Sequence, residues 1–210
     1  MEVQLGENEP GHYVEVNNHK IFGYSRYIDF YNNIVNNGED DQIFVEIGSF
    51  LGQSTAAMAY YIERSKKKIE FYAVDLFELS DFSDEPHANI IEQHGGNFFK
   101  AFTDNMEKAR VSDYVKPMKM SSKEAASNFE DRSISFLMID ASHKYEDVVE
   151  DIEAWFPKLK LGGIISGDDY DWHEVEQAAR DTLGVLGLAN NSTWFTKKQA
   201  LTLDEQRALK

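Results

Sequence analysis

The stretch IFVEIGSFLGQSTAAMA, residues 43–59, decides the fold, because an apolar run meets two glycines and then a helical segment. The run belongs to QIFVEI at 42–47, and nearly continuous apolar content is typical of a strand buried on both faces. Gly48 and Gly52 then lie at a strand-to-helix turn, where glycine permits a positive φ or a close approach to a ligand. In open α/β sheets, ligands bind at such turns, outside the carboxyl ends of the strands.

The same alternation of strand and helix continues along the chain. Six further apolar runs have the length of a strand: 68–74, 114–120, 133–139, 163–167, 185–190 and 193–197. Apolar residues at helical spacing occur at 27–35 and 148–156. Alternating strands and helices imply right-handed crossovers and a mostly parallel sheet. We therefore expect an α/β, doubly wound, Rossmann-like domain with seven strands, the last one antiparallel, and helices on both faces.

The chain is expected to divide into three parts. Residues 1–40 form an N-terminal helical segment packed on the core, residues 41–200 form the ligand-binding domain, and residues 201–210 form a polar tail. The segment 77–100 is long for a connection in a compact domain. This length favours a lid-like insertion, with Gly95 and Gly96 as its hinge.

Composition restricts the partners and the location of the protein. The chain has 37 acidic and 21 basic residues, a formal charge of −16 and no cysteine. The negative charge disfavours nucleic acid and anionic lipid, and the lack of cysteine excludes disulfides and thiolate metal sites. No apolar run approaches the ~20 residues that cross a bilayer, and the first residues do not resemble a secretory signal. We expect a cytoplasmic protein without nucleic-acid or membrane partners. Formation of a homodimer is possible from the sequence.

Acids at two strand ends indicate the kind of ligand. Glu46 lies at the end of the first strand, and Asp75 ends the next, where an acid can accept both hydroxyls of a ribose. Gly52 opens the helix and frees its first N–H groups, close to Ser54. The G-x-x-x-G spacing lacks the third glycine of G-x-G-x-x-G. The pattern indicates an adenosine-containing ligand without a diphosphate.

Three more acids follow two later strands. Asp140 comes directly after SISFLMI, and Asp168 and Asp169 come directly after GIISG. If these strands are parallel neighbours, the carboxylates converge, and their repulsion raises at least one pKa. A divalent cation removes that penalty, and ligation by oxygen alone suits magnesium, manganese or calcium. The alternative is that one acid caps the following helix and the others are solvated.

These motifs resemble a known family. VEIGSFLGQST (45–55) and YAVDL (72–76) are similar to the first two motifs of class I S-adenosylmethionine-dependent methyltransferases. IDASHKYEDVVEDIEAWFPKLKLGGIISGDDY (139–170) resembles the family that includes macrocin O-methyltransferase and cephalosporin-hydroxylase-like proteins. The resemblance covers residues 42–196 and implies that 41–200 is an S-adenosylmethionine-binding methyltransferase domain.

The resemblance also implies a role for individual residues. Asp75 would bind the ribose, and Ser122, in MSSKEAA, matches a site near the adenine. The residues beside the methionine end of the cofactor would be Glu46, Gly48, Gly52 and Ser54. The metal ligands of metal-dependent O-methyltransferases match Asp140, Asp168 and Asp169, with magnesium as the expected ion.

His143 is the candidate catalytic base, acting beside Asp140. Catechol methyltransferases carry a lysine at this place, and the macrocin branch uses an acid one residue earlier, where this chain has Ser142. Histidine titrates near neutrality and can take a proton from a hydroxyl. The alternative is that His143 only makes a hydrogen bond within the loop or caps the helix.

We therefore expect an S-adenosylmethionine-dependent O-methyltransferase that acts on a hydroxyl of a small molecule or glycan, with magnesium. Two other functions stay open. One is a domain that binds S-adenosylmethionine without catalysis. The other is a nicotinamide-dependent oxidoreductase, which the missing third glycine argues against.

Overall fold

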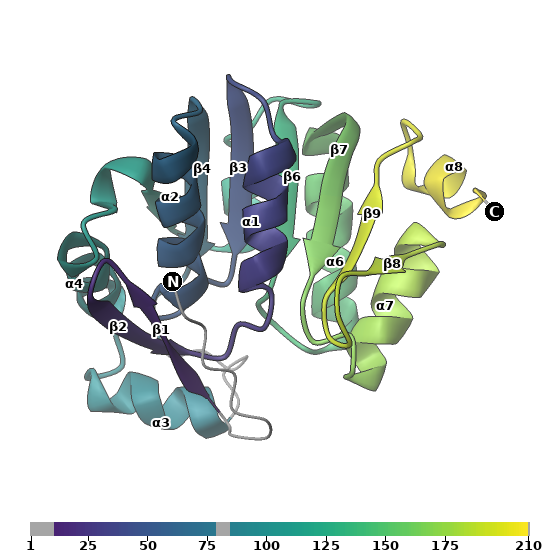
Figure 1. Ribbon diagram of the computed structural model, residues 1–210. Coiled ribbons are helices and arrows are strands. Elements are labelled where there is room, and N and C mark those ends of the chain that lie inside the picture. Colours follow the sequence, from purple (N-terminus) through teal and green to yellow (C-terminus); the bar gives the residue numbers. More distant parts are fainter. Residues whose placement is uncertain (1–10, 79–84, 210) are drawn as a thin grey trace.

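A computed structural model describes residues 11–78 and 85–209 and shows a seven-stranded sheet between two layers of helices (Figure 1). The strands lie in the order β5-β4-β3-β6-β7-β9-β8. Their bounds are β3 (Gln42–Ile47), β4 (Ile69–Asp75), β5 (Lys116–Lys119), β6 (Ile134–Ile139), β7 (Leu159–Gly167), β8 (Gly187–Leu188) and β9 (Trp194–Lys197). β3 pairs in parallel with both β4 and β6, and β9 is antiparallel to β7. The expected doubly wound sheet with an antiparallel last strand is confirmed.

Helices cover both faces of this sheet, as expected. In chain order, the helices are α1 (Ile28–Asn37), α2 (Gln53–Ser65), α3 (Glu85–Gln93), α4 (Phe99–Lys108), α5 (Ser122–Ala126), α6 (Tyr145–Trp155), α7 (His173–Leu183) and α8 (Leu203–Arg207). Short 3₁₀ helices lie at Ser112–Tyr114 and Phe156–Lys158. In Figure 1, α1 and α2 lie in front of the sheet, and α6 and α7 lie behind it. Every helix within the described ranges is too short or too polar to cross a membrane.

The alternation of side chains along β3 explains the two layers. Phe44 belongs to the apolar cluster that includes α1, α2 and α4, and its neighbour Val45 belongs to the cluster that includes α5, α6 and α7. Successive residues of a strand point to opposite faces, so a strand that is apolar at consecutive positions joins both clusters. The strand expected at 42–47 is β3, with the same bounds. β7 starts at Leu159, before the expected residue 163, because the pair Gly162 and Gly163 lies inside the strand and does not end it.

The N-terminal part differs from the expected helical segment. Within its described residues, only α1 is helical, and β1 (His12–Val16) and β2 (His19–Gly23) form a separate antiparallel hairpin. Asn17 and Asn18 make its turn with φ values of 50° and 66°. An Asn-Asn pair between two alternating runs is a recognisable hairpin signal, because both central residues of such a turn need positive φ.

Two further expectations concern the insertion and the tail. Residues 79–84 of the 77–100 insertion lie outside the described residues, and the rest contains α3 and a bridge between Glu78 and Asn97. Its role as a lid stays a prediction. The polar tail contains the short helix α8, which begins with a capping box between Thr202 and Glu205.

Candidate functional site

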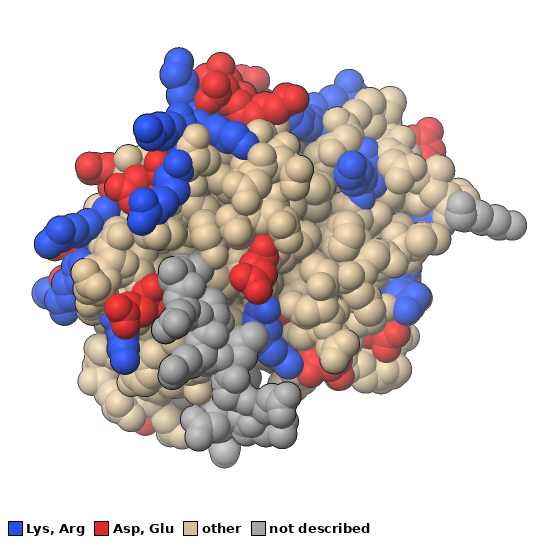
Figure 2. All heavy atoms as spheres, viewed as in Figure 1, with Lys and Arg blue, Asp and Glu red and all other residues tan. Residues whose placement is uncertain are grey.

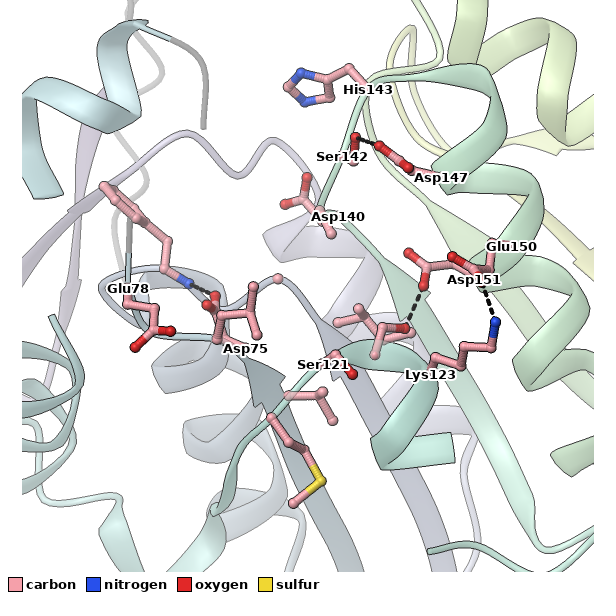
Figure 3. A pocket seen from close by; sticks show the side chains of 18 of the residues that line it. Asp75, Glu78, Ser121, Lys123, Asp140, Ser142, His143, Asp147, Glu150 and Asp151 are labelled. Atoms are coloured by element: carbon pink, nitrogen blue, oxygen red, sulfur yellow. Dashed lines mark hydrogen bonds and ion pairs between the residues drawn. The ribbon is translucent and has the colours of Figure 1, made fainter. Parts of the chain in front are cut away.

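A cavity of about 380 Å³ opens at the carboxyl ends of β3, β4, β5 and β6 (Figure 3). Its wall includes Gly48, Asp75, Ser122, Asp140 and His143, five of the residues that the sequence singled out. They come from four different strand ends and meet because the strands are parallel neighbours. The cavity therefore lies where ligands bind in open α/β sheets.

The turn after β3 requires both of its glycines. Gly48 has a φ of 83°, and a Cβ there would lie 1.7 Å from the carbonyl oxygen of Asp140. Gly52 has a φ of 86°, and a Cβ there would lie 2.4 Å from the Cε of Met106. Gly48 thus keeps the turn in contact with the end of β6, whereas Gly52 lets α2 pack against α4.

Asp75, the expected ribose ligand, holds this turn in place from the end of β4. Its Oδ2 accepts hydrogen bonds from the backbone N–H groups of Ser49 and Phe50, each at 2.8 Å. Its Oδ1 accepts one from the N–H of Phe77 at 2.7 Å. Figure 3 shows the carboxylate at the cavity wall. Asp75 therefore fixes the shape of the turn and lines the cavity, and its contact with a ribose stays a prediction.

Three of the six expected cofactor residues do not line the cavity: Glu46, Gly52 and Ser54. Glu46 is completely buried and accepts hydrogen bonds from the hydroxyls of Tyr31 (2.9 Å), Ser49 (3.1 Å) and Thr55. Burial raises the pKa of Glu46, and these hydroxyls, with that of Ser54, oppose the rise. The structure places Glu46 and Ser54 beneath the turn, where they support it.

The three carboxylates after β6 and β7 converge as expected. One oxygen from each of Asp140, Asp168 and Asp169 lies within 4.8 Å of the others. Burial, and then the charges of Asp169 and Asp168, raise the pKa of Asp140 well above its ordinary value. Burial and Asp169 raise the pKa of Asp168 to about 6, although Ser192 and Thr193 donate hydrogen bonds to it.

Asp169 differs from the other two acids. Burial acts to raise its pKa, but hydrogen bonds and charges from His143 and Arg26 outweigh burial and lower it. The backbone of Asp169 is left-handed, with a φ of 55°. Of the three, Asp169 is therefore the acid whose negative charge the protein itself compensates.

Sequence analysis missed Arg26 and Tyr27, which connect the N-terminal hairpin to this cluster. The Tyr27 hydroxyl donates to Oδ2 of Asp140 at 2.6 Å, and the Arg26 guanidinium lies 3.1 Å from Oδ1 of Asp169. Gln53 anchors the same connection, since its Oε1 accepts from the hydroxyl of Ser25 at 2.6 Å. Each of these two residues is more than a hundred positions away from its acid in the sequence. No local pattern could therefore reveal these contacts.

His143 lies at the opening of the cavity, next to the carboxylates. Its Nε2 is 2.8 Å from Oδ2 of Asp169. Its ring stacks on the indole of Trp172, with centroids 4.4 Å apart and planes 29° from parallel. Trp172 is 48% exposed. His143 thus has a fixed orientation that depends on β7 and the loop after it.

Comparisons with known proteins agree with this geometry. The family model described as "Methyltransferase domain" matches residues 45–170. A curated relative, the uncharacterized protein y4gI of Sinorhizobium fredii, is 27% identical over 130 residues, which are 62% of this chain. Those residues span only 13% of the relative.

Solved structures with the same fold include two methyltransferases. The O-methyltransferase NovP matches with a TM-score of 0.64 and 14% identity, over 82% of this chain and 79% of NovP. The calicheamicin methyltransferase CalS11 matches with a TM-score of 0.54 and 13% identity, over 81% of this chain and 76% of CalS11. The family model covers more than half of the chain, and so this chain belongs to the methyltransferase-domain family, with the fold of a class I S-adenosylmethionine-dependent methyltransferase.

Proposed function

We propose that this protein transfers the methyl group of S-adenosylmethionine to a hydroxyl of a small molecule or a glycan, with a magnesium ion held by Asp140, Asp168 and Asp169. The observation that carries the proposal is the position of this carboxylate cluster. It lies beside a cavity that Gly48 and Asp75 also line. The motif at 139–170 supports the finer assignment to the macrocin-type branch.

The donor set fits a hard divalent cation. All three side chains offer carboxylate oxygens, the ligands that magnesium prefers. The raised pKa values of Asp140 and Asp168 indicate that negative charge is undercompensated there. A bound cation would supply Lewis acidity, which makes a hydroxyl easier to deprotonate.

His143 is suited to receive the proton of the acceptor hydroxyl. The lowered pKa of Asp169 keeps that carboxylate ionised, so it can only accept a hydrogen bond. Nε2 of His143 therefore carries a hydrogen, and in the neutral ring Nδ1 is the nitrogen that takes a proton. In the proposed reaction the acceptor oxygen would take the methyl group from the sulfonium in line, His143 would receive the hydroxyl proton, and S-adenosylhomocysteine would leave.

Two features support a small, uncharged acceptor. The exposed indole of Trp172 offers a flat apolar surface beside His143, which suits stacking of an aromatic or sugar ring. On the described part of the face in Figure 2, basic side chains alternate with acidic ones and form no continuous positive patch. Together with the charge of −16, this distribution disfavours a nucleic-acid substrate.

The test has two stages. Isothermal titration with S-adenosylhomocysteine should show binding, and the absence of binding at high micromolar concentration would reject the proposal. Methyl-labelled S-adenosylmethionine is then incubated with a panel of catechols, hydroxylated aromatic acids and sugars. Asp168→Ala should abolish transfer and leave the affinity for S-adenosylhomocysteine nearly unchanged. If the cofactor binds but no acceptor is methylated, the domain is one that binds without catalysis.

His143→Ala separates the base from the metal site. Turnover should fall strongly, and higher pH should restore part of it, because a more basic solution deprotonates the acceptor without the imidazole. A rate close to that of the wild type would instead show that His143 only orders the loop.

A further inference from the structure

Asp151, in the middle of α6, lines the cavity although sequence analysis assigned it no role. Figure 3 shows its carboxylate across the cavity from Asp75, with Ser121 between them. The cavity therefore has room for a nucleoside that extends from Asp75 toward the side that holds Ser121, Ser122 and Asp151. Ser122 is the residue that the family motif places near the adenine.

The hydrogen bonds at this side have a defined direction. The indole Nε1 of Trp155 lies 2.9 Å from Oγ of Ser122, and an indole can only donate. Ser122 therefore accepts from Trp155 and donates its single hydroxyl hydrogen to Oδ1 of Asp151. Ser122 has no hydrogen left for a ligand, and within the described parts of the chain Oδ2 of Asp151 has no hydrogen-bond partner.

The neighbouring side chains direct hydrogens to partners within the protein. Ser121 donates its hydroxyl hydrogen to Glu124 at 2.8 Å. Lys123, the one cation among the described residues of the wall, makes an ion pair with Glu150. Apart from the Lys123 ammonium, which Glu150 holds, the side chains here consequently present acceptors to the cavity. Burial raises the pKa of Asp151 to about 6, which leaves the carboxylate mostly ionised at neutral pH.

We propose that Asp151, oriented by Ser122, selects adenine over a 6-oxopurine by accepting a hydrogen bond from the exocyclic amine of the base. This inference rests on the proposed use of S-adenosylmethionine and adds the residue that reads the nucleobase. Adenine places an N–H donor on C6, whereas hypoxanthine places a carbonyl acceptor there. A carbonyl oxygen facing an ionised carboxylate loses the hydrogen bond and adds repulsion.

The experiment compares S-adenosylhomocysteine with S-inosylhomocysteine, which differs from it only at the purine ring, by isothermal titration at pH 7.5. Wild-type protein should bind the adenosyl compound about ten- to a hundredfold more tightly, the range for a hydrogen bond to a charged group. Equal affinities would overturn the inference and leave the proposed function intact. Binding of neither compound would overturn both.

Asp151→Asn tests the residue itself. The asparagine carbonyl can keep the hydrogen bond from Ser122 and turn its amide N–H groups toward the ligand. The preference for the adenosyl compound should therefore fall below about threefold or reverse, because the loss of one charged hydrogen bond accounts for the whole difference. A wild-type preference in this variant would overturn the role of Asp151. If the variant does not fold, equal affinities in the wild-type comparison would still overturn the inference.

Asp147→Asn is the matched control. Asp147 lies one turn earlier on α6, lines the same cavity, and accepts a hydrogen bond from Ser142 at 2.6 Å. The substitution removes the same charge at a different place, so the ratio of the two affinities should equal that of the wild type. A ratio that collapses in this variant as well would show a general charge effect and overturn the inference.

Discussion

Glu46, a buried acid on β3, and Asp140, a partly buried acid directly after the neighbouring strand β6, have different surroundings. Each accepts a hydrogen bond from a tyrosine at the start of α1, Tyr31 for Glu46 and Tyr27 for Asp140. Glu46 has further hydroxyl donors, from Ser49, Ser54 and Thr55, and does not line the cavity. Asp140 lies at the cavity beside two other carboxylates.

The comparison shows how the same side-chain chemistry serves two purposes. Burial raises the pKa of both acids. Hydroxyl donors compensate Glu46 within the protein, so its contribution is to the stability of the turn. The neighbours of Asp140 include like charges, so a cation that bound there, as we propose, would relieve their repulsion. Four experiments test this distinction.

The largest difference should appear in metal binding. Asp140→Asn removes a proposed ligand and should weaken Mn²⁺ binding by more than about a hundredfold, beyond the usual effect of an outer-shell partner. Glu46→Gln should leave the affinity for Mn²⁺ unchanged. Titration of both variants with Mn²⁺, followed by electron paramagnetic resonance of the free ion, measures the effect. Equal losses in the two variants would remove the distinction.

The free energy of unfolding should distinguish the two variants in the opposite order, with the larger loss in Glu46→Gln. In Glu46→Gln an amide N–H group would face hydroxyls that donate hydrogen bonds to the carboxylate in the wild type. The variant should therefore lower the free energy of unfolding by about 1–3 kcal/mol. Asp140→Asn relieves repulsion and should not lower it. Urea denaturation in the presence of EDTA compares the two without metal. A more severe loss in Asp140→Asn would mean that Asp140 is the structural acid.

The two tyrosines allow a finer test. Tyr27→Phe removes the donor that orients Asp140 and should weaken Mn²⁺ binding by about tenfold, the effect of losing an outer-shell partner. Tyr31→Phe serves as the control, because its hydroxyl meets Glu46, and it should not change the affinity. The same Mn²⁺ titration applies, and an effect of Tyr31→Phe as large as that of Tyr27→Phe would contradict the prediction.

The smallest effect concerns pH. An acid whose pKa is raised by folding contributes stability below its ordinary pKa, and this contribution is lost as the pH rises through the raised value. The contributions of Asp140 and Glu46 to the stability of the metal-free protein should therefore fall as the pH rises from about 4 toward neutrality. Because the pKa of Asp140 is raised well above its ordinary value, Asp140→Asn should reduce this loss more than Glu46→Gln does. Melting temperatures in EDTA between pH 4 and 8 provide the measurement, and identical slopes in the two variants would contradict it.

Much of the fold, and the carboxylate cluster, could be predicted from local patterns. Apolar runs identify buried strands, and residues directly after parallel neighbouring strands must meet at one edge of the sheet. This logic placed Asp140, Asp168 and Asp169 together without any knowledge of their contacts. It failed for Glu46, because the residue lies one position before the end of β3 and its side chain is buried beneath the turn.

The remaining site residues leave weaker signals. Arg26 and Tyr27 reach the cluster through a connection that follows the hairpin, and their partners are far away in the sequence. Asp151 lies in the acidic segment YEDVVEDIEAW, which is typical of a solvated helix surface. Only the packing of α6 beside α5 brings it to Ser122. Such contacts depend on tertiary structure and are invisible to periodicity.

The left-handed backbone at Asp169 has a consequence for engineering the protein. At a φ of 55°, residues with a branched or bulky β-carbon are strained, whereas glycine, asparagine and aspartate adopt this conformation readily. Of these three, only asparagine and aspartate carry an oxygen that could reach a metal. Saturation mutagenesis at this codon should accordingly yield a very short list of working enzymes. Attempts to change which ion the proposed site prefers would have to vary other positions.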